Sequence, residues 1–146
     1  MDRKEILGYL EERFGLDRGL FDGLEFFERS KGRIFAVNKD ASKYLGLTKP
    51  VTAGLLFCRA HGSIKPTSNI IQIFGQKATK NVLGLDKELA KQFIQGFDLD
   101  VKEAGSCTNG YVILEYKDYP LGIGLLKDSK IKNMLNKGKR TNVELL

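Results

Sequence analysis

Apolar residues near the N-terminus recur with the spacing of one helix face. They are Ile6, Leu7, Leu10 and Phe14. With the polar residues between them, they predict an amphipathic helix over residues 3–14. Asp2, followed three residues later by Glu5, resembles a capping box, and Gly15 is a suitable residue to end a helix. We therefore expect the chain to open with a capped helix that buries one face.

The rest of the first half shows shorter patterns. Alternating aromatic and β-branched residues over 24–38 predict two strands joined at Ser30-Lys31-Gly32, which is typical of a hairpin. Asn38 is a suitable N-cap for a short helix. The further expected elements are that helix over 39–45, a strand over 51–60, a loop over 61–69 and a strand over 70–75.

The second half is dominated by short strand patterns. Asp86 and Gly96 bracket an expected helix, which follows a short apolar strand over 80–85. Strand candidates then come at short intervals, over 97–105, 110–116, 120–126 and 130–133. Such spacing predicts a small, strongly bent sheet or barrel. Gly122 and Gly124 fall on one face of their strand, which favours tight curvature or a close backbone approach there.

Length and composition favour one ordinary domain or two small ones. The chain has 146 residues, 42% of them hydrophobic, and no low-complexity linker. We predict an α+β fold with a small N-terminal α/β domain over 1–75 and a β-barrel-like domain over 76–146. We expect the two to pack closely.

Positive charge is segregated along the chain, whose net charge is +6. Residues 41–85 hold six basic and no acidic side chains, and residues 127–146 hold six basic and two acidic ones. The two segments between and before these are slightly acidic. This distribution is typical of a protein that binds a polyanion.

Catalytic and metal-binding patterns are not evident. Cys58 and Cys107 lack CxxC spacing, and His61 is the one histidine, so we expect reduced thiols, no metal, no cofactor and no enzyme activity. The charged N-terminus does not resemble a signal peptide, and no apolar run approaches the ~20 residues that span a bilayer. We expect a cytoplasmic monomer without a membrane partner.

Three motifs of the second half resemble the PUA domain, an RNA-binding module named for pseudouridine synthases and archaeosine transglycosylases. They are "QGFDL" at 95–99, "GYVIL" at 110–114 and "PLGIG" at 120–124. The resemblance covers about residues 76–133. It implies a pseudobarrel with a short helix, and RNA binding without catalysis.

Two families carry such a domain in a similar setting. The C-terminal domain of Nop/Sun-type rRNA 5-methylcytosine methyltransferases has an ending similar to "IKNMLNKGKR" at 131–140, although Asn136 replaces its proline. Nip-type ribosome-assembly factors place a small α/β domain first, and "LFCRAHGSIKPTSNIIQI" at 56–73 is similar to the stretch before their PUA domain. We favour the Nip-type arrangement, since residues 1–75 also have an α/β pattern.

The resemblance and the charge pattern together predict an RNA-binding surface. Its expected residues are Arg59, Lys65, Lys77, Lys80, Lys130, Lys132, Lys137, Lys139 and Arg140. A solvated, frayed terminus is the alternative for the last five. The expected ligand is rRNA or tRNA, in rRNA maturation, ribosome assembly or RNA modification, and the N-terminal domain is expected to hold a protein partner.

Other features leave alternatives open. Asn133 is interpreted as a turn residue rather than a reader of base edges. Tyr111, Tyr116 and Tyr119 are interpreted as sheet packing, with stacking on unpaired bases as the alternative. A different class of function is a protein-interaction adaptor, in which an apolar surface of the N-terminal domain docks a partner and the charges only maintain solubility. The residues of that surface would be Phe21, Phe26 and Phe27.

Overall fold

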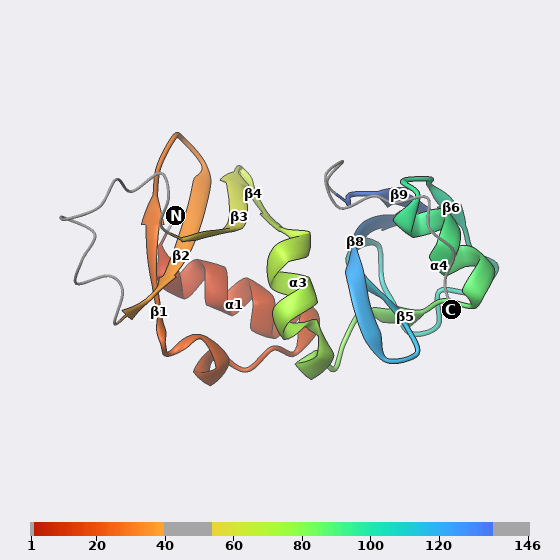
Figure 1. Ribbon diagram of the computed structural model, residues 1–146, viewed down its shortest axis with the longest axis horizontal. Coiled ribbons are helices and arrows are strands. Elements are labelled where there is room, and N and C mark those ends of the chain that lie inside the picture. The colour runs from red at the N-terminus through yellow and green to blue at the C-terminus, as the bar shows by residue number, and fades with distance from the viewer. Residues whose placement is uncertain (1, 40–53, 136–146) are drawn as a thin grey trace.

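The structure is a computed structural model, which describes residues 2–39 and 54–135. The predicted α+β class is confirmed. Figure 1 shows the N-terminal half as a helix packed on a twisted sheet, and the C-terminal half as a curled sheet with its own helix. The helix α3 (Ser68–Phe74) lies between the two sheets (Figure 1) and packs against the C-terminal one.

The first helix, α1 (Arg3–Phe14), begins and ends as its sequence predicts. The Asp2 carboxylate accepts a hydrogen bond from the Glu5 N–H at 2.9 Å, and Gly15 ends the helix in the left-handed conformation with φ 68°. The elements that follow are η1 (Arg18–Phe21), β1 (Leu24–Glu28), β2 (Arg33–Asn38), β3 (Leu55–His61) and β4 (Ser63–Pro66). The strands form an antiparallel sheet in the order β1-β2-β3-β4.

The strand predicted over 70–75 is wrong, because this segment belongs to α3. The loop predicted over 61–69 is wrong in part, since it contains β4 and the start of that helix. Thr67 caps α3 through its hydroxyl, which accepts a hydrogen bond from the Ile70 N–H at 3.4 Å. A short apolar run is ambiguous between strand and helix, and here the cap and the burial of Ile70 and Ile71 decide for the helix.

The C-terminal half follows η3 (Gly75–Lys77) and holds a sheet in the order β5-β7-β8-β9-β6. Its elements are β5 (Val82–Gly84), α4 (Lys87–Ile94), β6 (Leu99–Asp100), β7 (Gly110–Tyr116), β8 (Tyr119–Lys127) and β9 (Lys130–Asn133). The pair β5–β7 is parallel and the others are antiparallel. Of the strand expected over 97–105, only β6 forms. The short helix expected over 39–45 lies outside the described residues, apart from Lys39.

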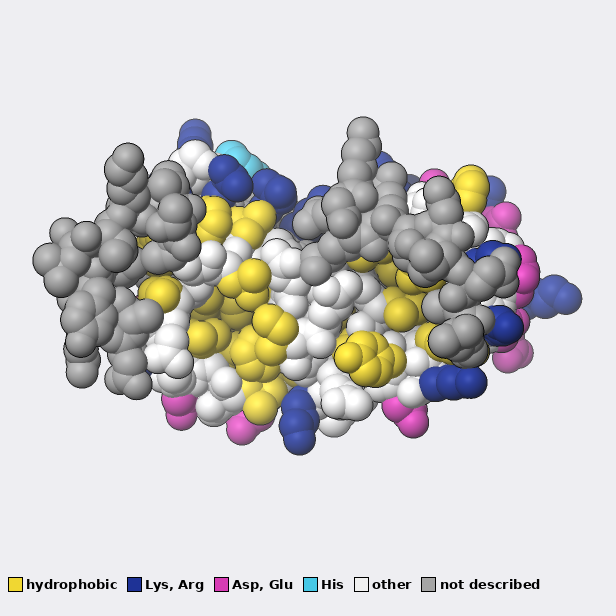
Figure 2. Space-filling view, viewed as in Figure 1, with side chains coloured by type: hydrophobic (Ala, Val, Ile, Leu, Met, Phe, Trp, Pro, Cys, Tyr) yellow, Lys and Arg dark blue, Asp and Glu magenta, His cyan; other side chains and the backbone are white. Residues whose placement is uncertain are grey.

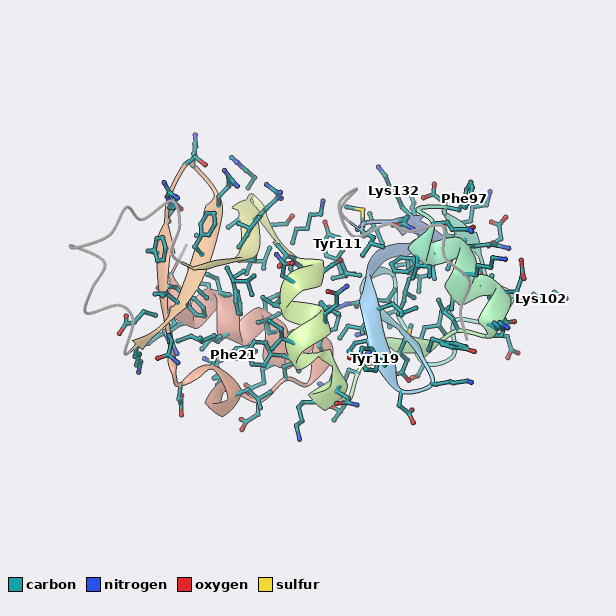
Figure 3. The ribbon with its side chains drawn as sticks, viewed as in Figure 1. Phe21, Phe97, Lys102, Tyr111, Tyr119 and Lys132 are labelled. Atoms are coloured by element: carbon teal, nitrogen blue, oxygen red, sulfur yellow. The ribbon has the colours of Figure 1, made fainter. Side chains whose placement is uncertain are left out.

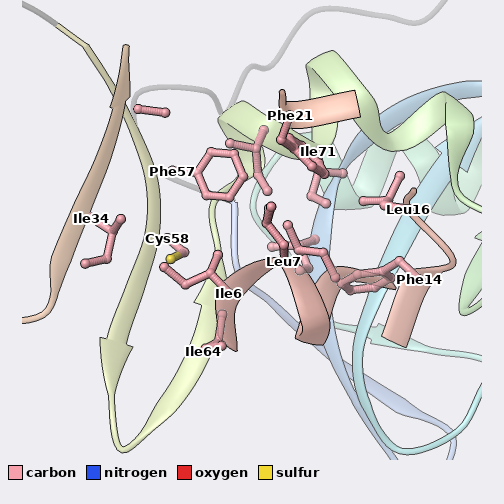
Figure 4. Packing of buried hydrophobic residues seen from close by; sticks show 14 of the residues in the cluster. Ile6, Leu7, Phe14, Leu16, Phe21, Ile34, Phe57, Cys58, Ile64 and Ile71 are labelled. Atoms are coloured by element: carbon pink, nitrogen blue, oxygen red, sulfur yellow. The ribbon is translucent and has the colours of Figure 1, made fainter. Parts of the chain in front are cut away.

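The two faces of the C-terminal sheet bury their side chains against different partners. One face packs against α4 and includes Val112, Leu114, Leu126 and Ile131. On the other face, Ile113 and Ile123 join the core of the N-terminal half, with residues such as Phe14, Phe57 and Ile71 (Figure 4). The hydrophobic core is therefore continuous between the two halves. The domain boundary expected at residue 75 stays a prediction.

Gly122 and Gly124 lie where other parts of the chain approach β8 closely. A Cβ at Gly122 would meet the Ser68 hydroxyl at 3.0 Å and the Phe93 ring at 3.3 Å, so this glycine leaves room for side chains of both α3 and α4 against the strand. A Cβ at Gly124 would collide with the Ile131 side chain. The close approach expected for this pair is confirmed.

Candidate nucleic-acid interface

Three basic residues stand side by side across the N-terminal sheet. Arg33 of β2 pairs with Arg59 of β3, which pairs in turn with Lys65 of β4. Their neighbours in the next register, Ile34 and Cys58, are buried, so the basic side chains belong to the opposite face of the sheet. Arg33 and Arg59 are exposed and Lys65 is half-buried. The register of three antiparallel strands thus creates a row of like charges.

A fourth cation reaches this row from the C-terminal half. In β9, Lys130 and Lys132 are exposed while Ile131 and Asn133 are buried. The pKa of Lys65 lies below its usual value of 10.5, first because the side chain is partly buried, and then because Arg59 and Lys132 repel its charge. We call Arg33, Arg59, Lys65 and Lys132 the cationic band. Basic side chains gather with the single histidine along the upper edge in Figure 2, above β3 and β4.

The cations of β8 and β9 extend the band along the C-terminal sheet. Lys127 pairs with Lys130, and Leu125 pairs with Lys132. A hollow of about 470 Å³ beside them is also lined by Asp98 and Asp100. Positive charge therefore weakens toward that edge of the sheet.

A cleft lies between the two halves, next to the cationic band. Its volume is about 490 Å³, and it is lined by Tyr9, Arg13, Gly62, Ser63, Ile64, Asn109, Gly110, Tyr111 and Leu125. We call it the junction cleft. Tyr111, Leu125 and Lys132 pair in register across β7, β8 and β9, so the cleft leads along one row to the band. In Figure 3, Tyr111 lies between the two halves, near Lys132.

Arg13 joins α1 to the start of β7. Its guanidinium donates hydrogen bonds to the Tyr111 carbonyl oxygen at 2.8 Å, the Thr108 carbonyl oxygen at 2.7 Å and the Thr108 hydroxyl at 2.6 Å. Burial raises the pKa of Tyr9 to about 12 and also raises the pKa of Tyr111. Both tyrosines therefore stay neutral near pH 7, and neither repels a phosphate.

Two of the predicted cations lie away from the band. The Lys80 ammonium donates to the Glu12 carbonyl oxygen at 3.5 Å. It lines a hollow of about 620 Å³, the α1 hollow, whose charged residues are Lys4, Arg18 and Lys80 against Glu5, Glu11 and Glu12. Lys77 lies in η3, beyond the end of α3 that is far from β4 (Figure 1). The structure brings together Arg59, Lys65 and Lys132, whereas Lys130 pairs with Lys127 and Asp100 at the other end of β9, and Lys77 and Lys80 lie elsewhere.

The last three predicted cations, Lys137, Lys139 and Arg140, lie outside the described residues. The turn role of Asn133 is confirmed. Its side chain donates to the carbonyl oxygens of Phe93 at 2.7 Å and Phe97 at 2.9 Å, and accepts from the Leu135 N–H at 2.9 Å.

The prediction that Phe21 belongs to an exposed docking surface is wrong. Phe21 is fully buried, in contact with the Phe57 ring at a centroid distance of 5.5 Å. Phe26 also packs on Phe57, and Phe27 stacks on Phe35. Of the tyrosines, Tyr119 is 68% exposed, whereas Tyr111 and Tyr116 are half-buried.

Sequence reasoning missed Arg33, Lys127 and Tyr9. Arg33 lies in a segment whose total charge is slightly negative, and summing over 40 residues concealed it. The alternation of exposed Arg33 with buried Ile34 was the local signal that could have found it. Tyr9 had no such signal, because only the packing of α1 against the second half places it at a cleft.

Within residues 2–39 and 54–135, no group of three His, Cys, Asp or Glu side chains could hold a metal ion. The same stretches contain no helix that is long and apolar enough to cross a membrane.

Two family models match parts of this chain. Residues 80–141 match the model of the methyltransferase RsmF PUA domain. Residues 1–47 match a family of unknown function, DUF7122. The resemblance to the PUA domain of Nop/Sun-type methyltransferases is thereby confirmed for the second half.

Two curated relatives carry the same name, ribosomal RNA small subunit methyltransferase F. The protein of Aeromonas salmonicida is 38% identical over 63 residues, which are 42% of this chain and 13% of that protein. The protein of Psychromonas ingrahamii is 35% identical over 72 residues, which are 49% of this chain and 15% of that protein. This chain thus covers about a seventh of the length of either relative. The Nip-type arrangement stays a prediction.

Proposed function

We propose that this protein binds RNA and serves as an RNA-targeting module, with rRNA as the first candidate and tRNA as the second. The observation that carries the proposal is the cationic band, in which the two basic segments of the sequence meet on one surface. The match of residues 80–141 to a PUA domain of an rRNA methyltransferase supports RNA as the polyanion.

The physical argument is that, in the free protein, holding these cations close together is energetically unfavourable. Lys65 is partly buried beside two other cations, and its lowered pKa records that the fold disfavours its charge. A phosphate placed between Lys65, Arg59 and Lys132 would relieve this repulsion. Each phosphate contact also releases counterions, so binding would weaken steeply with salt. A surface of this kind is explained by an anionic partner more readily than by solubility alone.

The proposed role is non-catalytic, in rRNA maturation, in ribosome assembly or in the delivery of an RNA-modification enzyme acting in trans. The protein would act as a monomer and hold a protein partner through its N-terminal half. We place it in the cytoplasm, which is supported by two unbridged cysteines, Cys58 and Cys107.

The test is a binding titration of the purified protein against fragmented rRNA and tRNA at two salt concentrations. We expect Lys65→Ala/Lys132→Ala to weaken binding and to lower the slope of log K against log salt by about two. Lys77→Ala/Lys80→Ala is the control with the same loss of net charge, and should change the slope little. The variant Lys137→Ala/Lys139→Ala/Arg140→Ala measures the contribution of the C-terminal segment.

The two outcomes separate the competing functions. Equal effects of both double variants would show that net charge acts rather than the band. If no RNA binds even at low salt, the proposal fails, and an adaptor that uses the exposed Ile73 and Tyr119 (59% and 68% exposed) becomes the better hypothesis.

A further inference from the structure

The junction cleft combines two features that a purely electrostatic surface does not need. Tyr9 and Tyr111 line it with aromatic area, and Leu125 adds an aliphatic wall. Its volume of about 490 Å³ falls in the range of about 300–1,000 Å³ that is usual for ligand pockets. Arg13 also lines the cleft, and its guanidinium donates hydrogen bonds to Tyr111 and Thr108.

The Tyr9 ring and the Tyr111 backbone are each held in place by contacts with the surrounding fold. The Tyr9 ring packs edge-to-face on Phe14, with an interplanar angle of 89° and ring centroids 6.1 Å apart. The backbone of Tyr111 is fixed by the Arg13 hydrogen bond to its carbonyl oxygen and by its pairing with Leu125. Aromatic groups that are ordered in advance lose little entropy when a flat ligand stacks on them.

Cations of both sheets lie beside the cleft. Lys65 follows the cleft residues Ser63 and Ile64 on β4, and Lys132 is the register partner of the cleft residue Leu125 on β9. A planar group in the cleft would therefore have positive charge beside it from both the N-terminal and the C-terminal sheet. The chemistry that matches a planar ring with neighbouring anionic groups is one nucleotide of a nucleic acid with its flanking phosphates.

We propose that the junction cleft takes one unpaired RNA base, which stacks against Tyr111 and Tyr9 while Lys65 and Lys132 contact the phosphates on either side of it. This inference rests on the proposed function, which it extends from RNA in general to RNA with an unpaired base. A base within a duplex is stacked on its neighbours and cannot enter a cleft between two protein segments, whereas a bulged or loop base can.

The experiment uses three RNA hairpins that share one stem. The first carries a single bulged 2-aminopurine, the second an abasic site at the same place, and the third is fully paired. With the full-length protein, we expect the bulged hairpin to bind about tenfold to a hundredfold more tightly than the abasic one. The 2-aminopurine fluorescence should be quenched on binding, because the base stacks on a tyrosine ring.

Variants assign the effect to the cleft. Tyr111→Leu should weaken binding of the bulged hairpin by a similar factor and leave the abasic hairpin unchanged, while Tyr111→Phe should retain the preference. Tyr119→Leu is the matched control, because Tyr119 is an exposed tyrosine on the lower part of β8 (Figure 3), where it does not line the cleft. Thermal unfolding of each variant identifies any loss of folding, and the fluorescence measurement needs no variant at all.

Equal binding of the three hairpins, or fluorescence that does not change on binding, would overturn the cleft assignment. In that case, salt-dependent binding to all three hairpins would leave the proposed RNA-binding function intact. Failure of every hairpin to bind would also overturn this inference, and the separate rRNA and tRNA titration would then decide whether RNA binding itself fails.

Discussion

The cationic band and the α1 hollow differ in what surrounds their positive charges. The hollow holds three cations, Lys4, Arg18 and Lys80, and three carboxylates that balance them. In the band, Arg33, Arg59 and Lys65 lie side by side, and the pKa of Lys65 is lowered first by its partial burial and then by Arg59 and Lys132. A count of basic residues along the chain includes both Lys65 and Lys80, yet Lys65 lies beside two other cations whereas Lys80 shares its hollow with three carboxylates.

This difference shows that a basic segment of the sequence forms a basic surface only when the fold brings no acidic residues of other segments next to it. Residues 41–85 contain no acidic residue, but Lys80 folds against α1, which supplies the missing carboxylates from a distant segment. Lys65 instead faces Lys132, which is just as distant in the sequence but carries the same charge. Four variants test this contrast, in order of decreasing expected effect.

The largest effect is expected from Arg13→Met, because Arg13 holds the two halves in the arrangement that brings Lys65 near Lys132. Its loss leaves the carbonyl oxygens of Thr108 and Tyr111 without their partner and should lower the free energy of unfolding by about 2 kcal/mol. Urea unfolding measures the change.

The matched control is Arg18→Met, which removes a half-exposed ion pair in which Arg18 Nε lies 3.3 Å from Glu11 Oε1. It should cost less than about 0.5 kcal/mol. Similar losses in the two variants would mean that the Arg13 contacts do not fasten the halves together.

The second variant, Ser63→Glu, places an acid beside the band at the rim of the junction cleft. It should imitate the balanced charge of the α1 hollow and weaken RNA binding by about tenfold at low salt, as expected for about 1.4 kcal/mol. The control Gln76→Glu adds the same charge at an exposed position in η3. If both variants weaken binding alike, the position of the band is irrelevant.

The third variant removes two of the three acids of the α1 hollow, by Glu11→Gln together with Glu12→Gln. Long-range attraction should then raise RNA affinity only about threefold at low salt, and the gain should vanish near physiological ionic strength. Glu88→Gln together with Glu103→Gln is the control of equal net charge. A gain of a hundredfold in the first pair alone would reveal that the hollow contacts RNA directly.

The smallest effect is expected from Lys132→Gln on the stability of the free protein. The folded state lowers the pKa of Lys65, so stability rises with pH between that lowered pKa and the usual 10.5, where only the unfolded state keeps the proton. Without Lys132, the pKa of Lys65 should rise and this dependence should become shallower.

Since solvent screens the repulsion between Lys65 and Lys132, the variant Lys132→Gln should gain only a few tenths of a kcal/mol in stability near pH 7. NMR titration of the Lys65 side chain and urea unfolding at pH 7 and 10 measure both effects, with Lys130→Gln as control. A pKa that falls in Lys132→Gln would contradict the repulsion on which the band depends.

Several elements were predictable because their signals are local. The cap of Asp2 and the left-handed Gly15 bound α1, and Asp86 caps α4 through a 2.8 Å bond to the Leu89 N–H. The strands of the second half follow from alternation and from turns between them. The segment 68–74 was not predictable in this way, since its isoleucines suit a strand or a helix equally well. In the structure this segment forms the helix α3, which packs against β8.

The sequence by itself determined the caps of α1 and α4, the closely spaced strands of the second half and the two segments of excess positive charge. Only the tertiary structure decided which cations meet. The register of β2, β3 and β4 aligns Arg33, Arg59 and Lys65. The contact between the two halves brings Lys132 to them, whereas Lys80 lies in a hollow with the acidic residues of α1. The reason is physical: capping and side-chain alternation act over a few residues, whereas electrostatic interaction depends on distances that only the packed chain sets.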